Sequence, residues 1–305
     1  LSQRLLARGE FARILTLRDG DFEGAERVLR AGLDLQHLVP ADDVSRHFLD
    51  HQLGILQIMT GRYDEALETL GGVVDRTVSG DIDPLRRGWV MNALSHVHAH
   101  LGHADEAIAL SIDTQSIAAE HGDPRLEMAA IAQRGLVALH GRDLDDALAR
   151  FGEAQVLNRR NGDVEKLATV ANYLGEAAAH KGDLARSREE FEVAWETSRR
   201  AGVAVEEVRA VVGFVWLAAA AGHVAVAAEA ADAARRHPSC GADANRLLDD
   251  VFERFGIASD ASDDGEVTAA GEPSEPWPND VVERVRGAAA DADDPDRSLT
   301  GASTP

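Results

Sequence analysis

Two pairs of histidines stand four residues apart, so each pair would lie on one face of a helix: His47 with His51, and His96 with His100. Imidazoles one helical turn apart can bind one zinc ion together. Neither pair carries the adjacent glutamate of a zinc-protease helix, and the sequence shows no third ligand beside them. A single cysteine, Cys240, excludes a site built from several cysteines. We therefore expect no metal and no other cofactor, and interpret these histidines as polar surface residues.

A second histidine series, His100, His140 and His180, repeats every 40 residues along the chain. Each of these histidines is expected at the end of a helix, where a partly charged imidazole interacts favourably with the negative end of the helix dipole. This structural role is sufficient to explain the series. The alternative is a stripe of stacked imidazoles that responds to pH.

No catalytic motif accompanies these histidines. The sequence contains no Gly-x-x-x-x-Gly-Lys-Ser/Thr phosphate loop, no Gly-x-Ser-x-Gly elbow and no kinase catalytic-loop set. We therefore expect that the chain is not an enzyme. An enzyme that depends on a metal or another ligand would need a site that the sequence does not show.

The elements that must position these side chains are helices arranged in a repeat. The turn from Gly61 to Leu67 (Gly-Arg-Tyr-Asp-Glu-Ala-Leu) recurs with register marks at 20, 61, 102, 142, 182 and 222, so the period is 40 to 41 residues. A second glycine series, Gly80, Gly122, Gly162 and Gly202, follows a second helix in each period. Two turns per period predict two helices per repeat, and no strand pattern is present.

The repeated turn resembles a known family. Gly-x-Tyr-x-x-Ala at 61–66, with Leu53-Gly54 and Leu174-Gly175 upstream of two turns, is similar to the tetratricopeptide repeat (TPR). The period is close to that of the long repeats in bacterial signalling ATPases of the maltose-regulon-activator type and in kinesin light chains. The resemblance covers about residues 2–236 and implies an all-α, right-handed α-solenoid of about six helix-turn-helix repeats.

The predicted domain comprises residues 1–256 and ends with a capping helix at 242–255. Its expected repeats are about 2–40, 41–80, 81–122, 123–162, 163–202 and 203–238. Residues 257–305 contain 12 acidic and 3 basic residues, a composition typical of a disordered tail. A short helix at 279–290, behind Trp277, is either a transient helix without a partner or a docking motif.

The resemblance also implies that the first helix of each repeat lines a concave groove that binds peptides. Its groove offsets and the neighbouring aromatic rings give the candidate binding residues His51, Trp89, Asn92, His96, Asn172, Glu176 and Trp216. An asparagine amide can both donate to and accept from the backbone of an extended peptide. The alternative is that these polar residues are solvated on an empty face. Neither lysine, Lys166 or Lys181, stands at an offset of the carboxylate clamp that binds acidic C-termini in this family.

Charge and hydropathy limit the classes of partner. The formal net charge of −22 repels nucleic-acid phosphates and anionic membrane surfaces, so we expect contact with neither. The longest apolar run, 210–221, is too short to span a bilayer, and no signal peptide precedes it, so a cytoplasmic location is expected. The expected function is a non-catalytic protein-interaction scaffold or sensor that binds a peptide or a partner protein. The alternative is that the chain is the C-terminal regulatory arm of a larger bacterial signalling protein, an ATPase-type transcription activator or a kinase, because it opens at Leu1 already in helical pattern.

Overall fold

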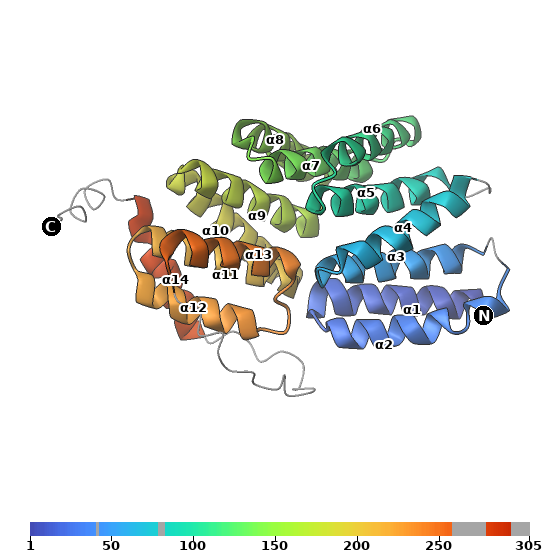
Figure 1. Ribbon diagram of the computed structural model, residues 1–305, viewed down its shortest axis with the longest axis horizontal. Coiled ribbons are helices and arrows are strands. Elements are labelled where there is room, and N and C mark those ends of the chain that lie inside the picture. Colours follow the sequence, from blue (N-terminus) through green and yellow to red (C-terminus); the bar gives the residue numbers. More distant parts are fainter. Residues whose placement is uncertain (41–42, 79–82, 258–278, 294–305) are drawn as a thin grey trace.

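The computed structural model describes residues 1–40, 43–78, 83–257 and 279–293. Within these ranges the chain forms 14 α-helices and no strand, and the first 12 helices form six consecutive pairs (Figure 1). This arrangement confirms the prediction of an all-α solenoid. The pairs are α1 (Ser2–Ile14) with α2 (Phe22–Leu33), α3 (Val44–Met59) with α4 (Tyr63–Val78), α5 (Pro84–His100) with α6 (Ala104–His121), α7 (Pro124–His140) with α8 (Leu144–Asn161), α9 (Val164–Lys181) with α10 (Leu184–Ala201), and α11 (Ala204–Ala220) with α12 (Val224–Arg236). None of the helices in the described ranges combines the length and the hydropathy needed to cross a membrane.

The turns between pairs follow from glycine and aspartate. Gly122 and Gly162 end α6 and α8 with φ of 65° and 69°, a left-handed conformation that glycine adopts without steric strain. Asp123 and Asp163 follow directly, and their carboxylates accept hydrogen bonds from the first backbone N–H groups of α7 and α9. Gly80 of the same series lies outside the described residues.

Small side chains allow the two helices of each pair to pack closely. The position five residues after each register mark is fully buried in all six pairs, and it is occupied by Ala25, Ala66, Ala107, Ala147, Ser187 and Ala227. Glycines on the first helices have a similar role. A Cβ atom added to Gly175 of α9 would lie 2.7 Å from the ring of Phe191 in α10. These contacts set the spacing between the paired helices.

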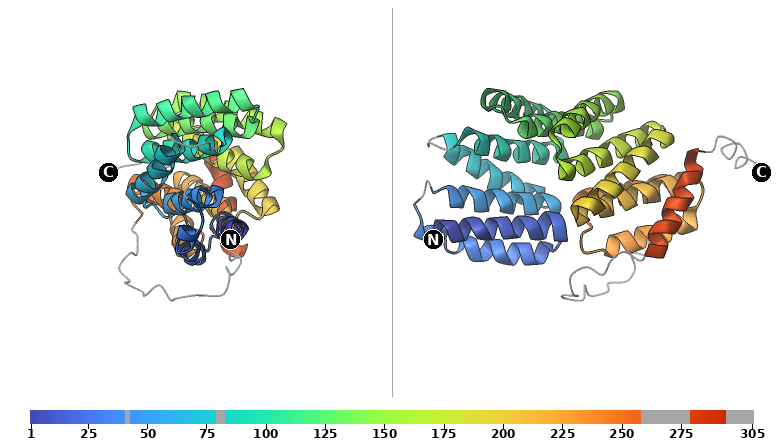
Figure 2. Two further views of the ribbon diagram at one scale, coloured as in Figure 1. Left: turned by 90° about the vertical axis from the view of Figure 1, so that its right-hand side faces the viewer. Right: turned by 180° about the vertical axis from the view of Figure 1, so that it is seen from behind.

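The array curves until its first and last pairs meet (Figures 1 and 2). A π-helical turn, η1 (Leu15–Asp19), extends α1 and contacts α11. The Arg18 guanidinium donates to the backbone oxygens of Ala201 and Gly202 at 3.3 and 3.4 Å. The hydroxyl of Ser239, which is fully buried, donates to the backbone oxygen of Asp19 at 3.2 Å. The ends of the solenoid are therefore in contact.

Two helices follow the sixth pair. The predicted capping helix forms as α13 (Ala242–Phe255), but it lies on the face formed by the first helices of the pairs (Figure 1). The end of the array is instead covered by α14 (Asn279–Ala290), which packs on α11 and α12 and continues into the 3-10 segment η3 (Asp291–Asp293).

The helix α14 stands where the sequence suggested a short helix, and it has a docking surface on the solenoid. Its apolar face is buried against α11 and α12 through Val281, Val282, Val285, Ala288 and Ala289. Arg284 pairs with Glu229 of α12 at 2.5 Å, and Arg286 pairs with Glu192 of α10 at 2.6 Å. The short helix anticipated at 279–290 therefore forms, and it packs on the solenoid through apolar side chains at helical spacing. The rest of the predicted tail, including Trp277, lies outside the described residues.

Candidate functional site

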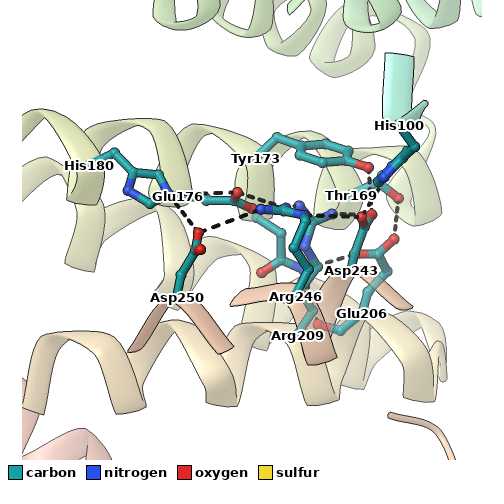
Figure 3. A network of polar contacts seen from close by, with 12 residues as sticks. His100, Thr169, Tyr173, Glu176, His180, Glu206, Arg209, Asp243, Arg246 and Asp250 are labelled. Atoms are coloured by element: carbon teal, nitrogen blue, oxygen red, sulfur yellow. Dashed lines mark hydrogen bonds and ion pairs between the residues drawn. The ribbon is translucent and has the colours of Figure 1, made fainter. Parts of the chain in front are cut away.

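The inner face of the solenoid is occupied by α13. Its apolar side chains Leu247, Leu248 and Val251 are buried in the core around α11. Its polar side chains Asp243 and Arg246 point the other way, toward α5 and α9 (Figure 3). This alternation at helical spacing makes α13 amphipathic: its apolar side packs on the core, and its polar side contacts charged residues. The first helices of the pairs therefore enclose a helix rather than an open groove.

Glu176 of α9 is the centre of the charged contacts between α13 and the pairs. Its side chain is fully buried, and its two oxygens accept hydrogen bonds from Arg209 Nη2 at 2.9 Å and from Arg246 Nη2 at 2.7 Å. Burial by itself would raise the pKa of Glu176, but Arg246 and Arg209 outweigh it and hold the pKa below its usual range. The carboxylate is therefore ionised and connects α9, α11 and α13.

Asp243, in the first turn of α13, makes a second set of contacts. Its Oδ2 accepts a hydrogen bond from the Tyr173 hydroxyl at 2.7 Å and lies 3.5 Å from Arg209 Nη1. The Arg209 guanidinium also lies over the Tyr173 ring, 3.6 Å from its centroid. Burial would raise the pKa of Asp243, yet Arg209 and the other nearby cations hold it well below its usual range. Glu176 and Asp243 are therefore both ionised within the buried network (Figure 3).

The histidine series faces this network. His100 stacks on Tyr63, with ring centroids 4.5 Å apart, and meets the edge of His140 at 4.6 Å. His180 Nε2 lies 3.5 Å from Asp250 Oδ2 of α13. A polar cavity of about 340 Å³ remains beside α13, and these three histidines line it together with Arg142. The three histidines of the series therefore line one cavity together and are not isolated residues at separate helix ends.

The histidine pairs predicted to be surface residues are largely buried. His47 is 7% exposed, and the side chain of His100 is 3% exposed. Burial lowers the pKa of His51 to about 4, of His96 to about 4 and of His100 to about 2, so these imidazoles are neutral at pH 7. The surface interpretation is wrong because the curvature of the solenoid turns this side of α3 and α5 inward.

Three of the candidate binding residues are buried in α9 and α11. Asn172 and Glu176 are fully buried, and Trp216 is 2% exposed. The Asn172 side chain donates to the backbone oxygen of Glu206 at 3.0 Å and to its carboxylate at 2.8 Å. Trp216 packs on His180 at 4.7 Å and on Phe255 of α13 at 5.5 Å. The expectation that these side chains are open to a ligand is wrong here, because Asn172 is bonded to Glu206 of α11, and α13 covers Glu176 and Trp216.

The other candidates lie toward the N-terminal half of the inner face. His51 and Trp89 line a cavity of about 160 Å³ between α3 and α5, which also includes Phe48 and Val73. Asn92, on the same side of α5, has a buried Oδ1 with no hydrogen-bond partner among the described residues. His96 approaches α13 itself. His51 and Trp89 therefore line a small cavity, whereas His96, Glu176 and Trp216 lie at the surface that α13 occupies.

The sequence reasoning missed Arg209, Asp243, Arg246 and Asp250. A signal for the first was present, because Arg209 is a single cation inside the apolar helix 204–220 and such a residue requires a buried partner. Asp243, Arg246 and Asp250 recur at three- and four-residue intervals, which places them on one face of their helix.

No family model and no curated protein sequence matches this chain. Similar solved structures include a Rap protein complexed with Competence and Sporulation Factor, with a TM-score of 0.56 and 12% identity over 96% of this chain and 89% of the Rap chain. PlcR from Bacillus thuringiensis, solved with the peptide PapR7 and DNA, has a TM-score of 0.55 and 13% identity, over 65% of this chain and 71% of the PlcR chain. A STAND ATPase with a tetratricopeptide repeat sensor from Pyrococcus horikoshii has a TM-score of 0.53 and 16% identity, over 82% of this chain and 35% of the ATPase chain. At these identities the likeness concerns the fold, and this chain is a TPR-like helical solenoid.

Proposed function

We propose that this chain is a non-catalytic protein-binding module, a scaffold or sensor whose binding surface is the inner face of the solenoid. One observation carries the proposal: this face holds an amphipathic helix, α13, by ion pairs on one side and an apolar strip on the other. A surface that recognises a helix of its own chain in this way has the chemistry to recognise a similar helix of a partner.

The contacts of α13 define the partner. An acidic residue, an arginine three positions later and an acidic residue four positions after that would match Asp243, Arg246 and Asp250. Apolar residues at the positions of Leu247 and Val251 would face α11. The partner is thus an amphipathic helix with this spacing. The Rap structure contains a bound factor and the PlcR structure a bound peptide, and both support a peptide-binding role for a solenoid of this shape.

The character of the α13 interface supports exchange between the internal helix and a partner. The interface includes charged side chains, and the Arg246 side chain keeps 29% of its surface exposed. The 340 Å³ cavity leaves Arg246 and Asp250 of α13 without close packing on one side. Polar, incompletely packed interfaces within one chain are those that open most readily.

A competition experiment with the full chain tests the proposal. The probe is a fluorescein-labelled peptide with the sequence of residues 241–256, and binding is followed by fluorescence polarisation. Arg246→Glu puts a carboxylate beside Glu176 and is expected to release α13 and expose the inner face. The variant should bind the peptide at least tenfold more tightly than the unmodified chain, in which the tethered α13 competes at high effective concentration.

Glu253→Arg is the matched control, because it reverses an exposed charge on the same helix. It should bind the peptide as weakly as the unmodified chain. Hydrogen exchange of residues 242–255 must rise in Arg246→Glu while α9 and α11 stay protected. An Arg246→Glu chain that releases α13 and still does not bind the peptide would refute the proposal.

A second candidate is that the chain is the regulatory arm of a larger signalling protein. The observation that favours it is that 82% of this chain aligns with only 35% of the STAND ATPase, a larger protein with a TPR sensor. The genomic sequence upstream of Leu1 tests this candidate. A stop codon or an unrelated gene immediately upstream would exclude it.

A further inference from the structure

Three potential metal ligands converge where α13 meets α5. His96 and His100 stand one turn apart on α5, Asp243 comes from α13, and one ligand atom of each lies within 4.8 Å of the others. The distance from His100 Nε2 to Asp243 Oδ1 is 3.4 Å. Tetrahedral zinc with bonds of about 2.0–2.1 Å requires ligand atoms about 3.3–3.4 Å apart. Two of the ligands therefore already have this spacing, and His96 needs only a small side-chain movement.

Two of the three ligand atoms are free of hydrogen bonds, and the third ligand, His96, interacts with Gln133. His100 Nε2 and Asp243 Oδ1 are both buried and have no hydrogen-bond partner within the described residues, whereas Asp243 Oδ2 is occupied by the Tyr173 hydroxyl. Buried polar atoms without partners are uncommon and often mark the position of an ion or a water. A cavity of about 20 Å³ adjoins this site and has room for one ion or one water molecule. Its lining includes His96, Tyr63 and Asp243.

The surrounding charges permit a dication despite two arginines. Arg209 Nη1 and Arg246 Nε lie 3.5 and 4.0 Å from the Asp243 carboxylate and would repel a cation. The network contains four carboxylates and three guanidinium groups, because Arg142 lies 3.8 Å from Asp250, so one negative charge is left for a cation to balance. These carboxylates belong to Glu176, Glu206, Asp243 and Asp250. Both histidines are buried in the neutral form that binds metals.

We infer that His96, His100 and Asp243 form a binding site for a transition-metal dication of the zinc class. Two imidazole nitrogens with one carboxylate oxygen favour zinc over the hard cations magnesium and calcium, which prefer oxygen ligands throughout. The three protein ligands leave a fourth position for water. Because the site joins α5 to α13, a bound metal would hold α13 on the inner face. This consequence rests on the proposed function, whereas the site itself does not.

Binding is tested on the full chain with Zn²⁺ by calorimetry and with Co²⁺ by the visible absorption of a four-coordinate ion. One equivalent should bind, and His100→Ala and Asp243→Asn should each weaken the affinity at least tenfold. Because Asp243 also anchors buried arginines, His96→Ala serves as a ligand variant that leaves those contacts in place. Circular dichroism verifies that each variant is folded.

The control is His98→Ala, on the same helix. His98 Nδ1 lies 3.2 Å from His103 Nδ1, so this pair could bind an adventitious ion. His98→Ala should retain the site. Failure of the full chain to bind one equivalent, or a complex lost in His98→Ala and retained in His100→Ala, would overturn the inference.

The regulatory consequence has its own measurement. Zinc should slow hydrogen exchange of residues 242–255 and weaken binding of the 241–256 peptide, and both effects should disappear in His96→Ala. Zinc bound at one equivalent without slower exchange would overturn the consequence alone. Peptide binding measured in the presence of a chelator tests the proposed function independently of the metal.

Discussion

The contact between Glu176 and Arg246 is predicted to hold α13 in place, and its contribution can be measured. Glu176→Ala removes the carboxylate that accepts from two arginines and leaves Arg209, whose side chain is 4% exposed, without that partner. Removing one member of a buried ion pair costs about 3–5 kcal/mol of unfolding free energy. Arg246→Ala should cost less, about 1.5–3 kcal/mol, because its side chain is 29% exposed and Glu176 keeps Arg209.

A double-mutant cycle separates this contact from the general effects of each substitution. Unfolding by urea, followed by circular dichroism, gives the free energies for both single variants and for the double variant. Groups in one charged network couple by about 0.5–3 kcal/mol, so the double variant should lose clearly less than the sum of the singles. Hydrogen exchange of residues 242–255 should rise most in the Arg246→Ala chain.

The control for this cycle is Asp249→Ala. Asp249 is also on α13, but its side chain is 68% exposed and pairs with Arg235 at the surface. An exposed pair of this kind contributes about 0–1 kcal/mol. The reasoning would be refuted if the effects of the two single variants add within about 0.5 kcal/mol in the double variant and the hydrogen exchange of α13 is unchanged. Such a result would mean that α13 is not held through Glu176.

Three further predictions concern packing, the last helix and pH. Gly175→Ala should lower the free energy of unfolding by about 1–3 kcal/mol, because its methyl group would lie 2.7 Å from the facing phenylalanine ring. Gly152→Ala, where the added methyl group would meet no facing atom within 4 Å, should stabilise α8 by about 0.5–1 kcal/mol. The melting temperatures of the two variants test this difference. Val285→Asp, at a position with 0% exposure, should release α14 to limited proteolysis and lower the melting temperature, and an unchanged digestion pattern would mean that α14 is not docked. The pKa of His51 and of His96 is about 4 in the folded chain because of burial, against 6.5 for an unperturbed histidine. Between these values the unfolded chain binds more protons, so stability should fall as the pH decreases from 6.5 to 4, by up to about 3 kcal/mol for each histidine; a melting temperature that does not change over this range would contradict the burial.

The sequence by itself determined the helix pairs. The glycine and aspartate at each turn act on neighbouring backbone groups, so their meaning is local and can be read from residue order. Gly122 and Asp123 end one helix and begin the next as the pattern predicts. The buried small position, for example Ala66, follows from the same period because each helix pair packs in the same way. The helix at 279–290 was also visible as an amphipathic segment, although the surface that it covers was not.

The tertiary structure alone decided what the inner face contains. The curvature that brings Arg18 to the end of α10 is the sum of small rotations between pairs, which no single repeat encodes. That curvature and the turn before α13 place Asp243 beside His100. They also place Arg246 beside Glu176, which lies 70 residues earlier in the sequence. The sequence showed a histidine pair without a third ligand and a groove without an occupant. Both were completed by one helix from the far end of the domain, because long-range contacts depend on how all the repeats stack rather than on the residues near each site.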